Sequence, residues 1–186
     1  MIEAVSGIAG AIGLSTSAGL NAYLPLLVVG LVARYTDLIR LNGPWDALTS
    51  GWVIAVLAVL LLIEMTVDKI PAVDTLNDGV QTIGRPLAGA ILFAAGSGIV
   101  GELHPVLAFI AGLLIAGGVH AAKTVARPAV TATTGGMGNW LVSLLEDVLS
   151  FIIAVVAILV PLLVLLVIAV VLIFYVQVTG NRSAEA

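Results

Sequence analysis

Three groups of polar side chains recur at helical spacing in an otherwise apolar chain. Glu64 and Asp68 are four residues apart, so a helix presents both carboxylates on one face. A second stripe is basic, with spacings of three and four residues, and consists of His120, Lys123 and Arg127. A third has four-residue spacing and consists of Asn139, Ser143 and Asp147, with Glu146 adjacent. Carboxylates in apolar surroundings are suited to carry a proton or a cation, and amides to form neutral hydrogen bonds.

A fourth polar stretch, STSAGLNAYLP at 15–25, interrupts the first apolar segment. Its hydroxyls, glycine and proline predict either one tilted helix or two helical pieces broken near Ser15–Gly19. A break would expose backbone groups to a ligand, as the interrupted helices of membrane transporters do. The candidate residues for binding an ion or a solute are therefore Ser17, Asn21, Glu64, Asp68, His120, Lys123, Asn139 and Asp147.

Other kinds of site have less support. Glu64, Asp68, His120 and Asp147 would offer hard ligands to a metal, but no motif such as H-E-x-x-H accompanies them. The serines lack a G-x-S-x-G motif or a neighbouring base, so nucleophilic catalysis is not indicated. The chain has no cysteine, which excludes disulfides and thiolate sites. We therefore predict no metal, no cofactor and no enzymatic activity.

The same charges also have a purely structural interpretation. Glu64 and Asp68 would pair with Lys123 and Arg127, so that the cluster neutralises itself. The small polar residues would then only let helices approach one another closely.

The elements that must position these residues are membrane helices. The chain has 186 residues, of which 61% are hydrophobic and 10% charged, and its mean hydropathy is +1.21. A soluble domain cannot bury that much apolar surface. The apolar regions lie at roughly 5–33, 51–68, 86–101, 105–126 and 148–178. The expected fold class is all-α: a polytopic bundle of about five spans, with 1–180 as one transmembrane domain and 181–186 as a polar tail.

Between Pro71 and Pro86, apolar residues recur at helical spacing among polar ones, which predicts a short amphipathic helix at 72–84 lying at the membrane interface. In a five-span arrangement the acidic, basic and amide stripes reach one side of the membrane, and the first span also starts there. The same side carries Lys69, Arg85, Lys123 and Arg127, so we place it and the N-terminus in the cytoplasm.

The N-terminus lacks the basic region of a signal peptide, so the first apolar segment should remain in the mature protein. The third and fourth spans are rich in glycine, which predicts close helix packing and a homo-oligomer in the membrane lipid. The segments 15–27 and 133–145 align through Asn21 and Asn139, a weak internal similarity. No basic patch supports a partner nucleic acid.

Four motifs in order resemble a known family: SAGLNAYLPLL at 17–27, DKIPAVDTLNDGVQTIGRPLAGA at 68–90, VHAAKTVAR at 119–127 and GNWLVSLLEDV at 138–148. Together they resemble the bacterial membrane proteins grouped as domain of unknown function 4126, over nearly the whole chain. The resemblance implies a compact, multi-spanning, single-domain membrane protein and supplies no substrate.

We therefore expect a small transporter or permeation protein of the bacterial inner membrane, with a one-sided polar vestibule for an ion or small polar solute. In this hypothesis Glu64, Asp68 and Asp147 bind a proton or cation. The alternatives are a membrane scaffold or assembly factor and, with less support, an intramembrane enzyme acting on lipid.

Overall fold

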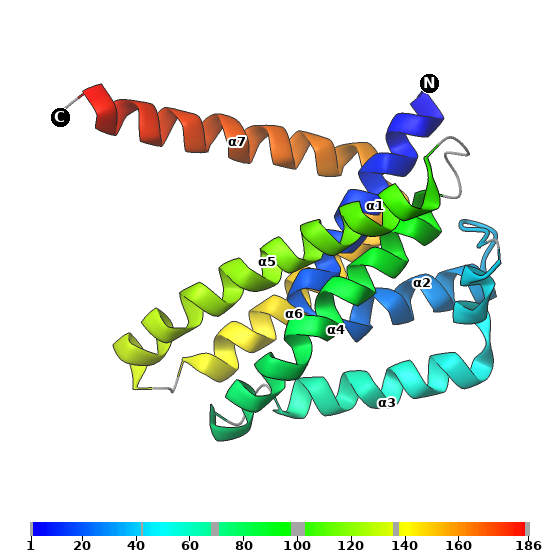
Figure 1. The fold of residues 1–186 in the computed structure, drawn as a ribbon, viewed down its shortest axis with the longest axis horizontal. Helices are drawn as coiled ribbons and strands as arrows, with labels where there is room; N and C mark the ends of the chain where they lie inside the picture. Colours follow the sequence, from blue (N-terminus) through cyan, green and yellow to red (C-terminus); the bar gives the residue numbers. More distant parts are fainter. Residues whose placement is uncertain (1, 42, 68–70, 98–102, 136–137, 185–186) are drawn as a thin grey trace.

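The structure is a computed structural model that describes residues 2–41, 43–67, 71–97, 103–135 and 138–184 (Figure 1). All of the regular structure in these ranges is helical, which confirms the all-α fold class. The elements are α1 (Ile2–Leu20), α2 (Tyr23–Tyr35), the 3-10 helix η1 (Trp45–Thr49), α3 (Gly51–Val67), α4 (Pro71–Ser97), α5 (Pro105–Thr134), α6 (Asn139–Leu159) and α7 (Pro161–Ala184).

The first apolar segment is indeed divided, but later than the sequence predicted. Helix α1 continues through Ser15–Gly19 and ends at Leu20, and α2 begins at Tyr23. The cause lies in Pro25, whose ring would clash with the carbonyl of Asn21 in a continuous helix but fits the first turn of a new one. The side chain of Asn21 then accepts the N–H groups of Tyr23 and Leu24, at 3.1 and 2.9 Å, and so caps α2.

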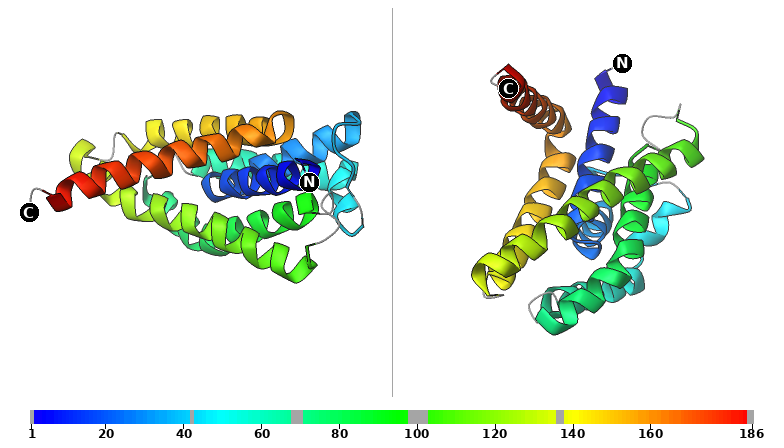
Figure 2. Two further views of the ribbon diagram at one scale, coloured as in Figure 1. Left: turned by 90° about the horizontal axis from the view of Figure 1, so that it is seen from above. Right: turned by 60° about the vertical axis from the view of Figure 1, so that its left-hand side comes forward.

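The chain reverses at Asn21–Ala22, which we call the α1–α2 break. Figure 1 and the left-hand view of Figure 2 place the start of α1 and the end of α2 at the same end of the bundle. Glu3 and Ser6 there share one cavity with Leu38 and Leu41. The expectation that α1 starts beside Lys123 and Arg127 is therefore wrong, because α1 approaches that cluster from the opposite end.

Residues 72–84 are helical as predicted, but they do not form a separate interfacial helix. Helix α4 runs without interruption from Pro71 past Pro86 to Ser97. A proline inside a helix is tolerated where neighbouring helices support it, and Pro86 packs near Gly117 of α5. The polarity is also inverted, because Gln81 and Arg85 are buried while Val80 and Ile83 are about two-thirds exposed.

Helices α4 and α5 lie side by side along the bundle (Figure 1). They approach each other closely at Gly89 and Gly112, where an added Cβ would collide with the facing backbone. These glycines therefore serve packing within one chain and no longer support the predicted homo-oligomer, which stays a prediction.

The region at 148–178, predicted as one span, is divided at Val160. Pro161 cannot extend α6, since its ring would meet the carbonyl of Ala157. Helix α7 turns back there and runs away from the other helices (Figure 1).

By length and composition, two of the described helices are long and apolar enough to cross a membrane: α5 and α6. Helices α2 and α3 and the start of α7 are apolar but shorter, and five spans are not confirmed. The outer surface nevertheless carries large exposed apolar side chains, such as Trp52, Leu114 and Val125, while charged side chains are buried inside. That distribution is the one expected where lipid surrounds the helices.

Candidate functional site

The backbone at the α1–α2 break is held by two charged side chains from other helices. Glu64 of α3 accepts the N–H of Ala22 at 3.4 Å, and Lys123 of α5 donates to the carbonyl of Leu20 at 3.5 Å. A carboxylate thus faces the N-terminus of α2 and an ammonium the C-terminus of α1. Both charges match the partial charges of the helix ends and therefore stabilise them.

Glu64 also forms a buried ion pair with Arg85 of α4. The nitrogen–oxygen distance is 3.1 Å, and neither side chain is more than 1% exposed. Arg85 further contacts Nδ1 of His120, 3.1 Å away. Because a guanidinium can only donate, we assign this Nδ1 as the acceptor and Nε2 as the protonated nitrogen, which lies 3.2 Å from the hydroxyl of Thr82.

A second pairing joins α5 to α6. The Lys123 ammonium lies 2.8 Å and the Arg127 guanidinium 3.2 Å from the same carboxylate oxygen of Glu146. Both cations are almost fully buried, and Glu146 is slightly more exposed. Lys123 therefore contacts both the carboxylate of Glu146 and the carbonyl of Leu20 at the break.

Helix α6 also contacts the break. Asp147 accepts a hydrogen bond of 2.9 Å from the side-chain amide of Asn21. One turn earlier in α1, Ser17 donates to the carbonyl of Ser150 at 2.7 Å, and Ser150 returns a hydrogen bond to the carbonyl of Ser17. This reciprocal pair fixes the register of α1 against α6.

Of the residues singled out in the sequence, Ser17, Asn21, Glu64, His120, Lys123 and Asp147 lie at or near the break. We call the following residues the ionisable cluster: Glu64, Arg85, His120, Lys123, Arg127, Glu146 and Asp147. Glu64 pairs with Arg85 and not with Lys123 or Arg127. Asp68 and its predicted pairing lie outside the described residues.

Sequence reasoning missed Arg85 as a member of the site, because it treated this residue as a loop charge. A signal was present: Gln81, Arg85 and Ala88 share one helical face, and all three are buried. Glu146 was noticed only as a neighbour of Asp147, yet it holds both Lys123 and Arg127.

Asn139 is not brought to the break. It starts α6 and exchanges hydrogen bonds with Thr131 across the turn from α5. Eight residues of helix, about 12 Å, separate it from Asp147. Ser143 lies between the two, is fully buried, and has no hydrogen-bond partner for its hydroxyl among the described residues.

Within the described ranges, no group of three or more Asp, Glu or His side chains is arranged to hold a metal ion. The formal charges of the ionisable cluster sum to zero, with three cations and three anions, when His120 is neutral.

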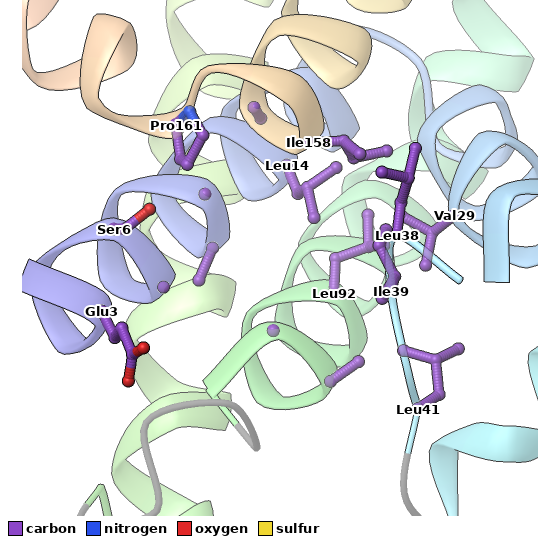
Figure 3. A pocket seen from close by; sticks show the side chains of 16 residues that line it. Glu3, Ser6, Leu14, Val29, Leu38, Ile39, Leu41, Leu92, Ile158 and Pro161 are labelled. Atoms are coloured by element: carbon purple, nitrogen blue, oxygen red, sulfur yellow. The ribbon is translucent and has the colours of Figure 1, made fainter. Parts of the chain in front are cut away.

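A cavity of about 320 Å³ lies at the opposite end of the bundle from the α5–α6 turn (Figure 3). Its lining comes from α1, α2, α4, α6, the first residue of α7 and the segment that follows α2. None of the predicted binding residues contributes to it.

No curated protein and no solved structure matches this chain. One family model does match, that of a domain of unknown function (DUF4126), over residues 8–180. Because this match covers nearly the whole chain, the protein belongs to the family of domain of unknown function 4126.

Proposed function

We propose that the protein is a small membrane transporter whose site for an ion or small polar solute lies at the α1–α2 break. The observation that carries the proposal is the contact of both broken helix ends with ionisable side chains, Glu64 and Lys123. Membrane transporters bind anionic groups at the N-termini of interrupted helices and cations at their C-terminal carbonyls.

The contacts suggest how a solute would bind. An anionic group would compete with Glu64 for the N-terminus of α2, and a cation would compete with Lys123 for the carbonyl of Leu20. Either displaced side chain keeps a partner, Arg85 for Glu64 and Glu146 for Lys123. Binding would therefore not leave a buried charge without compensation, which makes the exchange energetically feasible.

The membrane arrangement is part of the proposal. Helices α3 to α7 would make the five crossings. Helix α1 would enter the bilayer and α2 would leave it on the same side of the membrane. The membrane would be the bacterial inner membrane. The N-terminus would then lie on the side opposite to the α5–α6 turn.

The test is flux into vesicles reconstituted with the purified full chain, using a panel of inorganic ions, organic acids and amines, with and without a pH gradient. Wild-type protein should transport at least one solute. Glu64→Gln should reduce that flux by about tenfold, the effect of losing 1.4 kcal/mol of stabilisation of the transport barrier. Asp46→Asn, at an exposed carboxylate of η1 beyond the far end of α2 and outside the cavity lining, is the matched control and should transport normally.

Absence of flux for every solute in the panel, from wild-type protein that remains folded in the vesicles, would show the proposal to be wrong. The scaffold function would then take its place, and one observation favours it. The ionisable cluster neutralises itself, as a purely structural network should.

A further inference from the structure

We propose that the cavity at the opposite end of the bundle is a second access route to the α1–α2 break, closed by an apolar gate of Leu14, Val29 and Leu92. This inference rests on the proposed transport function, because it supplies the path by which a solute would leave the site on the other side. A transporter needs such a path from each side of the membrane to its central site.

The mouth of the cavity lies at the surface. One wall is formed by Glu3 and Ser6 in the first two turns of α1, and the facing wall by Leu38 and Leu41 beyond the end of α2 (Figure 3). Glu3 and Leu38 are exposed. The volume of about 320 Å³ suits a small solute together with water.

Between the mouth and the floor, small residues let the helices pack closely around the cavity. Gly10 lies so close to α6 that an added Cβ would be 3.0 Å from the carbonyl of Ala157. A Cβ added at Gly96 of α4 would similarly lie 3.3 Å from the Cβ of Ala11. Larger side chains at these glycines would force α1 away from α6 or α4, so the sequence keeps these helices close around the cavity.

The floor is the proposed gate. Leu14, Val29 and Leu92 line the cavity, are at most 6% exposed, and belong to the same buried apolar cluster as Ala18 and Ala22. Ala22 is part of the break itself and contacts Glu64. Leu14 is seven residues before Asn21 in α1, so the apolar layer is about 10 Å thick. About two turns of α1 thus separate the floor of the cavity from the α1–α2 break.

The experiment uses the absence of native cysteine. A single cysteine, Ala18→Cys, is placed beyond the gate and treated in sealed vesicles with a small, charged, membrane-impermeant thiol reagent. Ser6→Cys at the mouth identifies the side on which the cavity opens. The reagent is then applied from that side to Ala18→Cys alone, with Leu92→Ala, and with Leu26→Ala. Leu26 is the matched control, a buried leucine of the same cluster that does not line the cavity.

Opening the gate should raise the labelling rate of Ala18→Cys by about tenfold or more, because a thiol reacts as its thiolate, which forms in water and not in an apolar core. This rise is expected with Leu92→Ala and not with Leu26→Ala. An equal rise in both would indicate general loosening, and no rise in either would show that the layer is packing only. Either result would overturn the gate. Val29→Ala replaces Leu92→Ala if that variant does not fold.

Failure of this inference differs from failure of the transport proposal. If Ala18→Cys stays unlabelled with Leu92→Ala and with Val29→Ala, in vesicles that transport a solute, this route is disproved and the transport proposal stands. Labelling through the opened gate, in vesicles that transport nothing, supports the route and disproves transport.

Discussion

Asn21 joins three helices through a single side chain. Its oxygen accepts two backbone N–H groups at the start of α2, while its amide nitrogen donates to Asp147 of α6. A side-chain amide offers both a donor and an acceptor without carrying a charge. The residue therefore caps α2 and stabilises the charge of Asp147 at the same time.

Asn21→Asp retains the cap but replaces the donor to Asp147 with a second carboxylate. Aspartate caps a helix as well as asparagine does, so Asn21→Asp would not lower the stability if capping α2 were the only role of Asn21. Two carboxylates at hydrogen-bonding distance repel, so we expect Asn21→Asp to have a lower melting temperature than Asn21→Ala. Thermal unfolding of the detergent-purified variants measures this.

The rescue variant is Asn21→Asp with Asp147→Asn, which restores one donor and one carboxylate with their places exchanged. Its melting temperature should exceed that of Asn21→Asp. A wild-type melting temperature for Asn21→Asp itself would show that the hydrogen bond to Asp147 contributes nothing.

The ion pair between Glu64 and Arg85 should show strong energetic coupling. Removing one partner leaves a buried charge and should cost about 3–5 kcal/mol, whereas replacing both with apolar residues is much less costly. Glu64→Leu and Arg85→Met should therefore each lower the free energy of unfolding, and the double variant should be less destabilised than the sum. Chemical unfolding of all three measures the coupling.

Arg40→Met is the control, because its pair with Asp37 is exposed on both sides. We expect its effect to be below about 1 kcal/mol. Additive effects of Glu64→Leu and Arg85→Met would contradict the pairing in the structure.

At the scale of the elements, prolines decide where helices end only together with packing. Pro25 and Pro161 each follow a break, whereas α4 continues through Pro86. The sequence predicted helices from hydropathy and spacing, and these are confirmed as α-helical. It could not predict which proline ends a helix, because the outcome depends on the neighbouring helix, here α5 with Gly117 beside Pro86.

The same limit applied to the candidate site. Helical spacing correctly grouped the stripes of α5 and α6, since all members of each stripe are buried on one face. The predicted pairing of Glu64 with Lys123 or Arg127 was wrong, because the partner of a charge depends on the direction from which each helix approaches. The reversal at Asn21 set that direction for α1, and the spacing of residues carries no information about it.

The contact between α4 and α5 gives a test at this scale. Gly112→Val should force the two helices apart, because an added Cβ would collide with the backbone of Gly89 and Ala90. Overpacking of this kind costs about 1–3 kcal/mol or more. Gly118→Val, on the same helix with open space around it, should change the stability far less. Equal melting temperatures for the two variants would contradict the intrachain packing.

The whole molecule encloses a charged interior within an apolar surface. Two features lie at different ends: the ionisable cluster near the α1–α2 break, and the cavity beyond Leu14, Val29 and Leu92. Helices α1 and α2 connect them, because α1 ends and α2 begins at the break and both helices contribute residues to the lining of the cavity. Motion of α1 or α2 would therefore affect both features, which is how one site could open to two sides in turn.

The central claim is that the ionisable cluster is a site reached by water and not sealed packing, and labelling of Ser143→Cys tests it most directly. Ser143 lies one turn from Asp147 on α6 and is fully buried, as is Ser150, whose hydroxyl is bonded to Ser17. With the impermeant thiol reagent applied from the side of the α5–α6 turn, Ser143→Cys should react and Ser150→Cys should not. If both remain unlabelled while an exposed loop cysteine reacts, the cluster is packed helix contact and the account of a transport site is wrong.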